Sequence, residues 1–352
     1  MELCADAMRG AITAAPGHKL VVADLSNIEG RAMAWLAQEK WKIRAFRDFD
    51  EGKGEDLYKV SYGKSFSVDP ATVTKDQRQI GKVQELMLQY EGGVGAYITG
   101  AATYRIDLEA LAKTALRVIP GNILGQAKIM LDWHRKKRKK CPAAGFGLSE
   151  DAWTMCESFK LAWRDAHPAT VQLWRDLDAA VRDAIHNPGT TYYAGMLKVR
   201  RSGAWLRIVL PSGRALCYPG PALLPEKQLR QKALDDMEDA IDQDASGRTV
   251  ITYMGMNQYT RKWGRITTYS GKLAENCIQA IARDVMATNM PHIEAAGYSI
   301  ALTVHDEIIA EAPDEPQYNP EHLAALLCAP PSWAPDMPLA AAGFEAYRYK
   351  KD

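Results

Sequence analysis

Two short apolar segments, one near each end of the chain, lead into an aspartate. Residues 20–23 are apolar and predict a buried strand, and Asp24 follows at once. Apolar residues alternate over residues 300–304 and resume at Ile308, so residues 298–312 predict two strands joined by a tight turn that contains Asp306. A carboxylate in such a place is costly unless it meets a cation or a donor. Either aspartate alone could be an ordinary turn residue, whereas two converging carboxylates are what a pair of Mg²⁺ ions requires.

The composition excludes several classes of protein. Of the 352 residues, 47% are hydrophobic and 25% are charged, which is ordinary globular composition and excludes a wholly disordered chain. No stretch approaches the roughly 18 apolar residues of a membrane span, and residues 1–20 lack the apolar centre of a signal peptide. The six cysteines form no CxxC pair, which argues against a zinc site or a disulfide framework and favours a reducing cytoplasm. The net charge is only +1, so contact with nucleic acid would need local clusters of cations.

A helix is expected over residues 74–89, and one of its faces carries two cations and an aromatic ring. Arg78, Lys82, Leu86 and Tyr90 recur every four residues, so they form one slowly winding stripe. Two cations one turn apart suit a triphosphate, and the ring suits a base. A solvated basic face is the alternative interpretation.

A second polar stripe is expected on a helix over residues 271–290. Its members are spaced by four, three and four residues, which aligns them for donation to bases or phosphates: Lys272, Asn276, Gln279 and Arg283. A plain solvent-facing stripe has the same spacing. The six consecutive cations at residues 135–140 predict an exposed segment that either contacts phosphate or only aids solubility.

The remaining segments predict a mostly helical middle of the chain. Helices are expected from Ser26 to about residue 38, across residues 46–120 and over residues 150–187, where four large aromatic side chains are expected to be buried: Trp153, Phe159, Trp163 and Trp174. Residues 205–218 predict a hairpin around residues 211–213. The charged residues 226–248 predict a solvated helix with a loop, and the proline-rich residues 330–338 predict irregular structure.

Three segments together resemble the motifs of the family A, bacterial polymerase I-like DNA polymerases. Residues 24–31, Asp-Leu-Ser-Asn-Ile-Glu-Gly-Arg, resemble motif A, whose pattern is Asp-Tyr-Ser-Gln-Ile-Glu-Leu-Arg. The stripe over residues 78–90, followed by glycines, is similar to motif B, and residues 304–307, Val-His-Asp-Glu, match motif C. The order of the motifs is that of the family, and residues 263–265 and 271–276 resemble its phage branch. Three spaced motifs in the right order are far more specific than any one of them.

The resemblance implies an α+β fold with a polymerase palm, which holds an antiparallel sheet, and a largely helical fingers domain. The palm is expected to comprise residues 1–45 and 266–352, and the fingers residues 46–265 with inserted helices and a hairpin. Only 23 residues precede Asp24, so the thumb and exonuclease domains that family members place before motif A are expected to be missing.

The implied activity is template-directed DNA synthesis by nucleotidyl transfer from a dNTP to a primer 3′-hydroxyl, with two metal ions. Asp24 and Asp306, with the backbone carbonyl of Leu25, are expected to bind two Mg²⁺ ions. Arg78 and Lys82 are expected to hold the incoming phosphates and to stabilise the charge that develops there.

Further roles implied by the resemblance concern the nucleotide and the DNA. Glu29 is expected to exclude the ribonucleotide 2′-hydroxyl, and Tyr90 to stack near the template base. His305 and Glu307 are expected near the primer terminus, with Glu307 counted among the catalytic residues. The residues expected to contact DNA, besides His305, are Gln279, Arg31, Lys272, Asn276 and Arg283.

Four positions depart from the family pattern. Asn27 replaces a glutamine that is one methylene longer. Leu86 stands where the family usually has Phe or Tyr, so an aliphatic group is expected to face the 3′ side of the sugar. Gly271 and Glu275 replace an arginine and an asparagine of polymerase I, and the neighbouring Lys272 and Asn276 are candidates to replace their minor-groove contacts.

Two alternatives remain open at this point. A catalytically weak or silent fragment that binds primer–template DNA would need a partner to supply the thumb or processivity, whereas the intact aspartates and cations favour an enzyme. A single-subunit RNA polymerase shares the two-aspartate palm, but Glu29 argues against it because that position must be small to admit a 2′-hydroxyl. The expected partners are primer–template DNA and a dNTP, without a membrane, and the expected compartment is the cytoplasm, that of the host if a phage encodes the chain.

Overall fold

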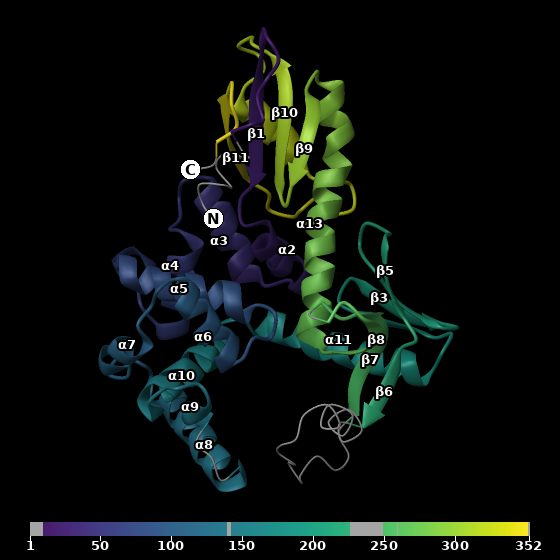
Figure 1. The fold of residues 1–352 in the computed structure, drawn as a ribbon. Helices are drawn as coiled ribbons and strands as arrows, with labels where there is room; N and C mark the ends of the chain where they lie inside the picture. Colours follow the sequence, from purple (N-terminus) through teal and green to yellow (C-terminus); the bar gives the residue numbers. More distant parts are fainter. Residues whose placement is uncertain (1–9, 139–141, 226–248, 259, 351–352) are drawn as a thin grey trace. The chain divides into compact units, whose positions relative to one another are not determined.

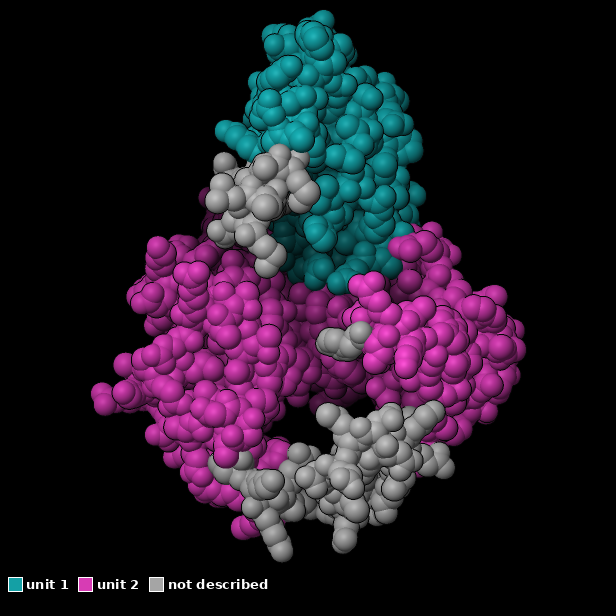
Figure 2. Space-filling model, viewed as in Figure 1, with its two compact units in different colours: residues 1–35, 278–352 teal, residues 36–277 magenta. Residues whose placement is uncertain are grey.

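The computed structural model describes residues 10–138, 142–225, 249–258 and 260–350, and the chain divides into two compact units (Figures 1 and 2). Unit 1 combines residues 1–35 with residues 278–352, and unit 2 is formed by residues 36–277. The two units therefore divide between residues 35 and 36 and between residues 277 and 278. Helices α2 (Ile28–Ala37) and α13 (Ser270–Ala295) each contribute residues to both units.

Unit 1 is built on a four-stranded antiparallel sheet that draws strands from both ends of the chain. The strand order is β11 (Ala341–Ala346), β1 (His18–Leu25), β10 (Glu307–Pro313) and β9 (Ser299–Val304). The apolar centre of β1 is buried and pairs with β10 on one side and β11 on the other, as a buried strand predicts. Strands β9 and β10 form the expected hairpin, in which Val304 pairs with Glu307 across a two-residue turn.

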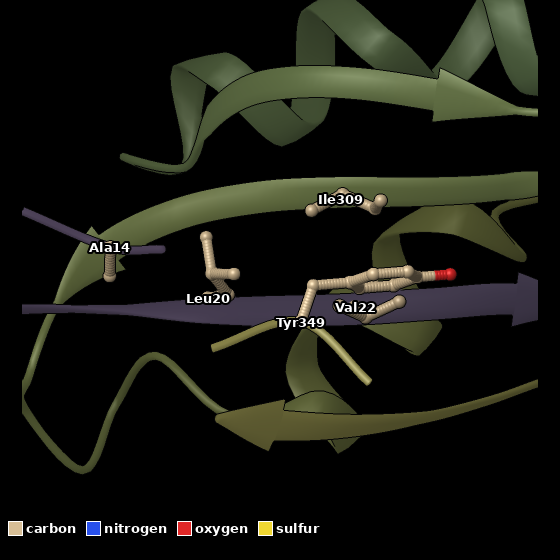
Figure 3. Packing of buried hydrophobic residues seen from close by; sticks show 5 residues of the cluster. All are labelled: Ala14, Leu20, Val22, Ile309 and Tyr349. Carbon is tan, nitrogen blue, oxygen red and sulfur yellow. The ribbon is translucent and has the colours of Figure 1, made fainter. Parts of the chain in front are cut away.

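One face of this sheet holds a compact apolar cluster, to which β1 contributes alternate residues. Because side chains alternate along a strand, Leu20 and Val22 share a face while Val21 lies on the other. Figure 3 shows the Tyr349 ring lying along β1 beside Val22. The buried members of the cluster are Ala14, Leu20, Val22, Ile309 and Tyr349. Helix α14 (Pro320–Leu327) also packs against β1 and β11.

Unit 2 begins with a series of helices, as the sequence predicted for its middle segments. They are α3 (Lys40–Asp50), α4 (Leu57–Phe66), the short 3-10 helix η1 (Pro70–Thr72), α5 (Lys75–Leu88), α6 (Val94–Thr103), α7 (Leu108–Ala115), α8 (Gly121–Arg138), α9 (Pro142–Gly145), α10 (Glu150–Ala166) and α11 (Pro168–His186). The helical region expected over residues 150–187 consists of two helices, because Pro168 cannot donate a backbone hydrogen bond and starts a new helix. Helix α5 begins as expected, since Thr74 caps it and forms a capping box with Gln77.

The core of unit 2 contains the four predicted aromatic anchors, which are all buried: Trp153, Phe159, Trp163 and Trp174. It also contains a charged network around Glu85 of α5. The Glu85 carboxylate pairs with Lys42 of α3, and both side chains are buried. It also accepts hydrogen bonds from Ser61 Oγ at 2.5 Å and Trp163 Nε1 at 2.9 Å. Nε2 of His167 lies 3.0 Å from Glu85 Oε1, so four side chains converge on one carboxylate.

Two small antiparallel sheets follow α11 within unit 2. The first has the order β2 (Thr191–Ala194), β3 (Leu197–Ser202), β4 (Trp205–Val209) and β5 (Ala215–Pro219), and β4 and β5 form the predicted hairpin. The second has the order β6 (Ala222–Pro225), β7 (Thr249–Met256) and β8 (Trp263–Thr268). Strands β2, β3, β6, β7, β8 and β11 were not expected from the sequence.

The α+β class predicted from the sequence is confirmed by this mixture of helices and antiparallel sheets. The helix predicted for residues 226–248 lies outside the described residues. Within the described part of the chain, no helix combines the length and the apolar character needed to cross a membrane.

Candidate active site at the ends of strands β1 and β10

The two candidate metal-binding aspartates lie at the same end of the sheet in unit 1. Asp24 is the second-to-last residue of β1. In the strand register it pairs with Glu307, the residue that follows Asp306. The backbone N–H of Leu25 donates to the backbone carbonyl of Asp306 at 3.1 Å. Both aspartates are half-buried. The sheet therefore brings together two residues from opposite ends of the chain, as their positions at strand ends predicted.

The turn between β9 and β10 presents Asp306 beside the end of β1. His305 in this turn is exposed and has φ 55°, the left-handed conformation that a tight hairpin turn requires. Histidine is one of the side chains that adopts this conformation more readily than most. Its local role is thus to close the turn while keeping its ring in solvent.

Glu307 has a different environment from the one expected for a residue at the primer terminus. Its side chain is only 2% exposed, and its Oε1 accepts a hydrogen bond from the Tyr349 hydroxyl at 2.7 Å. Asp24 and Glu307 are directly opposite in the register, so their side chains leave the same face of the sheet, the face of the Tyr349 cluster. Glu307 is therefore a buried residue that links the start of β10 to Tyr349, next to the turn that contains Asp306.

The connection from β1 to α2 explains one departure from the motif A pattern. Asn27 has φ 49°, and asparagine occupies this left-handed region at less cost than most residues. The helix begins at Ile28, directly after this left-handed residue. A Cβ atom at Gly30 would lie 2.5 Å from Oδ1 of Asn27, so the space above Gly30 is filled by the Asn27 side chain.

Arg31 and Glu29 extend the site along the first turns of α2. Arg31 is 2% exposed, and its Nε donates to the backbone carbonyl of Ser26 at 2.7 Å, which braces the connection between β1 and α2. Glu29 is half-buried in the first turn of the helix. Arg31, expected to contact DNA, is thus a buried residue that helps to hold the backbone after Asp24.

Two of the candidate DNA-binding side chains of α13 belong to unit 1. Gln279 and Arg283 are both exposed, one helical turn apart. Nη1 of Arg283 lies 3.3 Å from Oγ1 of Thr303 in β9, so this side chain links the helix to the strand that leads into the Asp306 turn. The four-residue spacing predicted from the sequence is therefore an exposed stripe next to the candidate site.

The other candidate residues belong to unit 2 and are already engaged there. The guanidinium of Arg78 forms two hydrogen bonds with the Asp56 carboxylate, at 3.1 and 2.7 Å, and lies 5.2 Å from the centre of the Tyr58 ring. The ammonium of Lys82 lies 4.6 Å from the centre of the Tyr104 ring. Burial, followed by the nearby carboxylates of Glu85 and Asp56, raises the pKa of the Tyr58 hydroxyl to about 12, so the ring that faces Arg78 remains neutral.

The remaining residues of the two stripes are half-buried. These are Leu86, Tyr90, Lys272 and Asn276. The Lys272 ammonium pairs with Glu275 at 2.7 Å, and Nδ2 of Asn276 donates to the Tyr218 hydroxyl at 3.1 Å. Three residues next to candidate side chains were missed from the sequence: Asp56, Tyr104 and Tyr349. Each contacts its partner across more than 20 positions of the chain, and such pairs leave no local periodicity.

The fold of the chain is that of a polymerase domain. It is similar to the POL domain of Pol1 from M. smegmatis, solved in complex with DNA primer-template and dNTP, with a TM-score of 0.53 and 19% sequence identity. The match covers 97% of this chain and 42% of that one.

Sequence comparisons then give the relatives. No protein-family model matches. The chain is 32% identical over 348 residues to a DNA polymerase of Bacillus phage SP02. This match covers 98% of this chain and 43% of that protein. It is also 32% identical over 90 residues to DNA polymerase I of Chloroflexus aurantiacus, 26% of this chain and 9% of that protein. The chain thus spans less than half the length of these relatives, and it is related to the polymerase portion of the family A DNA polymerases, as its motifs predicted.

Proposed function

We propose that this chain is the polymerase portion of a DNA polymerase, which transfers a nucleotidyl group from a dNTP to the 3′-hydroxyl of a primer paired with a template. The observation that carries the proposal is the register of β1 and β10. It sets Asp24 and Asp306 side by side at one end of the sheet, in a chain related to family A DNA polymerases. The proposed partners are therefore primer–template DNA and a dNTP.

The proposed cofactor is a pair of Mg²⁺ ions held by Asp24, Asp306 and the carbonyl of Leu25. These are hard oxygen donors, which Mg²⁺ prefers. Among the described residues, no group of three His, Cys, Asp or Glu side chains forms a metal site made by protein alone. This fits Mg²⁺, which is typically held by one or two carboxylates together with substrate phosphates and water. When bound, the ions would stabilise charge on the attacking and leaving oxygens.

The chain's own side chains have proposed roles in binding and orientation. Arg78 and Lys82 hold the triphosphate, and Glu29 excludes the ribonucleotide 2′-hydroxyl. Leu86 faces the 3′ side of the sugar, and Tyr90 stacks near the template base. DNA contacts fall to the exposed or half-buried side chains His305, Gln279, Arg283, Lys272 and Asn276.

Arg31 and Glu307 are proposed to act through other residues. Each is 2% exposed, so neither is placed to contact DNA directly. Arg31 holds the turn after Asp24 through the Ser26 carbonyl, and Glu307 holds strand β10 through Tyr349. Both are therefore positioning residues for the two aspartates.

The test is primer extension by the purified chain with dNTPs and Mg²⁺. Asp24→Asn and Asp306→Asn should each reduce the extension rate by more than about 100-fold. Loss of a residue that only supports a metal ligand typically costs about 10- to 100-fold, and these variants remove a proposed ligand itself. The matched control is Asp314→Asn, because Asp314 lies just beyond the opposite end of β10 and its side chain is 70% exposed. The control should extend primers at the wild-type rate, and all variants should have unchanged circular dichroism.

Two results would contradict the proposal. Extension by Asp24→Asn at the wild-type rate would show that this site does not catalyse nucleotidyl transfer. Binding of primer–template DNA without any extension would instead support the alternative of a binding-only portion that needs a partner. Replacing dNTPs with rNTPs tests the remaining alternative, since efficient RNA synthesis would indicate an RNA polymerase.

A further inference from the structure

The four-stranded sheet β2–β5 has one buried face and one exposed face, and the exposed face carries no acidic side chain. Leu197, Val199, Leu206 and Ile208 are buried on one face, where α11 packs against β2 and β3. The residues between them on β3 and β4 point the other way and are exposed. We call this exposed set, together with Tyr193 of β2, the basic sheet face: Tyr193, Lys198, Arg200, Trp205 and Arg207.

The pairing of the strands confirms that these five residues share a face. Tyr193 is directly opposite Lys198, and Arg200 is directly opposite Arg207. Lys198 and Arg200 are two residues apart on β3, and Trp205 and Arg207 are two residues apart on β4, so each pair also lies on one side of its strand.

The charges on this face are unusual because they repel one another. Like charges that lie directly opposite in a sheet are destabilising, and here Arg200 faces Arg207. No Asp or Glu occurs between Asp183 and Glu226, so the sheet supplies no counter-charge of its own. Within the described residues, the three cationic side chains of the basic sheet face make no hydrogen bond or ion pair. This arrangement costs folding stability, and a bound polyanion would relieve that cost.

The two aromatic residues indicate which polyanion fits. The exposed fractions of Tyr193 and Trp205 are 65% and 43%, so both rings are available for stacking. Rings interleaved with cations on a flat surface are the arrangement that binds single-stranded nucleic acid, because each base stacks on a ring while the cations follow the backbone. The bases of a duplex are already stacked and would leave both rings unused.

We propose that the basic sheet face binds single-stranded DNA. That this strand is the unpaired template ahead of the primer rests on the proposed function. The binding itself does not, since it requires only the cations and rings of one sheet. Arg201 of the same strand is excluded from the site because it donates to the carbonyls of Ile185 and Gly203, at 3.0 and 3.3 Å, and so belongs to the structure of unit 2.

The test is binding of a fluorescein-labelled oligothymidylate to the full chain, measured by anisotropy without primer, nucleotide or Mg²⁺. Trp205→Ala should weaken binding about 5- to 150-fold, as removal of a base-stacking ring does. Arg200→Gln with Arg207→Gln should reduce the slope of log affinity against log salt by about 1.4, which is about 0.7 for each phosphate contact with a single strand. The same double variant should melt at a higher temperature than wild type, because it removes the repulsion between the two arginines.

Two control variants match the chemistry at other places in unit 2. Phe49→Ala removes an aromatic ring that is 48% exposed on α3, and Arg175→Gln removes an exposed arginine of α11. Both should bind the oligonucleotide like wild type. Unchanged affinity of Trp205→Ala and of the double arginine variant would overturn the proposal. The proposal would also be overturned if Trp205→Ala had no effect and the double arginine variant weakened duplex and single-stranded DNA equally. Phosphate contact alone would then explain the binding. Failure of the chain to extend primers would leave all of these outcomes unaffected.

Discussion

Arg78 has two neighbours that fix the direction of its guanidinium. The Asp56 carboxylate accepts hydrogen bonds from Nε and Nη2 of Arg78, and the Tyr58 ring lies beside the guanidinium. The stripe of motif B predicts Arg78 from its spacing alone. It gives no sign of Asp56, which lies 22 positions earlier and is also the N-cap of α4. A residue that acts through a distant partner is found only when the fold brings the two together.

Asp56→Asn provides a test of what this pair does. Asparagine retains the helix cap, so it separates the charge from the capping role. The side chains of Arg78 and Asp56 are 36% and 26% exposed, so loss of the pair should change the free energy of unfolding by less than about 1 kcal/mol. A triphosphate competes with the carboxylate for the guanidinium, so we expect the KM for dNTP to fall several-fold with kcat unchanged. Single-nucleotide incorporation measures both constants, and a rise in KM would show instead that Asp56 orients Arg78 for the nucleotide.

Helix α5 is also anchored by a buried charge, the carboxylate of Glu85. Glu85 is buried between Lys42, Ser61, Trp163 and His167. Burial alone raises the pKa of the Glu85 carboxyl, but Lys42 and His167 with their hydrogen bonds outweigh it and hold the pKa well below its ordinary value of 4.5. The network thereby fixes the rotation of the helix that carries Arg78 and Lys82.

This network makes stability depend on pH in a defined direction. The folded-state pKa of Glu85 is lowered, so its contribution is present above pH 4.5 and is lost as the pH falls below it. In that range the unfolded chain binds one proton more, and the free energy of unfolding should fall by up to about 1.4 kcal/mol per pH unit from this group. Urea unfolding from pH 7 to pH 3 should show this component in wild type and not in Glu85→Gln.

At pH 7, Glu85→Gln should cost about 3–5 kcal/mol because it leaves the Lys42 ammonium buried without its partner. The control is Lys42→Met combined with Glu85→Gln, which removes that charge and keeps an oxygen acceptor for Ser61 and Trp163. The double variant should recover most of the loss. If it is as unstable as Glu85→Gln, the ion pair is not the source of the effect.

The elements that the sequence predicts well carry a local signal. Helix α5 has a capping box and a four-residue period, and β10 has a run of apolar residues. Strand β11 has neither, because its sequence Ala-Ala-Gly-Phe-Glu-Ala has little strand propensity. It becomes a strand because it pairs with β1. Strand β3 was hidden for another reason, since the cations Lys198 and Arg200 occupy its exposed alternate positions.

Because the chain forms two compact units, a substitution can destabilise one unit without the other. In β11, a Cβ atom at Gly343 would lie 2.1 Å from the Val22 carbonyl oxygen, so Gly343→Ala forces β11 and β1 apart. We expect a loss of about 1–3 kcal/mol, as overpacking costs, confined to unit 1. Amide hydrogen exchange should show faster exchange in β1, β10 and β11 and unchanged exchange in α10 of unit 2.

The control for this change is Gly264→Ala in β8, where an added Cβ has no atom within 4 Å. It should leave exchange unchanged in both units. A uniform loss of protection across the whole chain in Gly343→Ala would show that the units unfold together. The sequence gives no sign of where the two units divide, because α2 and α13 run through the dividing points without any break in composition.

The place of β1 in the middle of its sheet has a consequence for synthesis on the ribosome. Both of its neighbours, β10 and β11, are encoded near the other end of the chain. At about 5–20 residues per second, the strand that carries Asp24 leaves the ribosome roughly 15–60 s before β10 exists. During that interval unit 2 can fold while an apolar strand remains unpaired. The candidate active site therefore forms only after β10 and β11 have been translated, and until then β1 is the apolar strand that the cell's chaperones must protect.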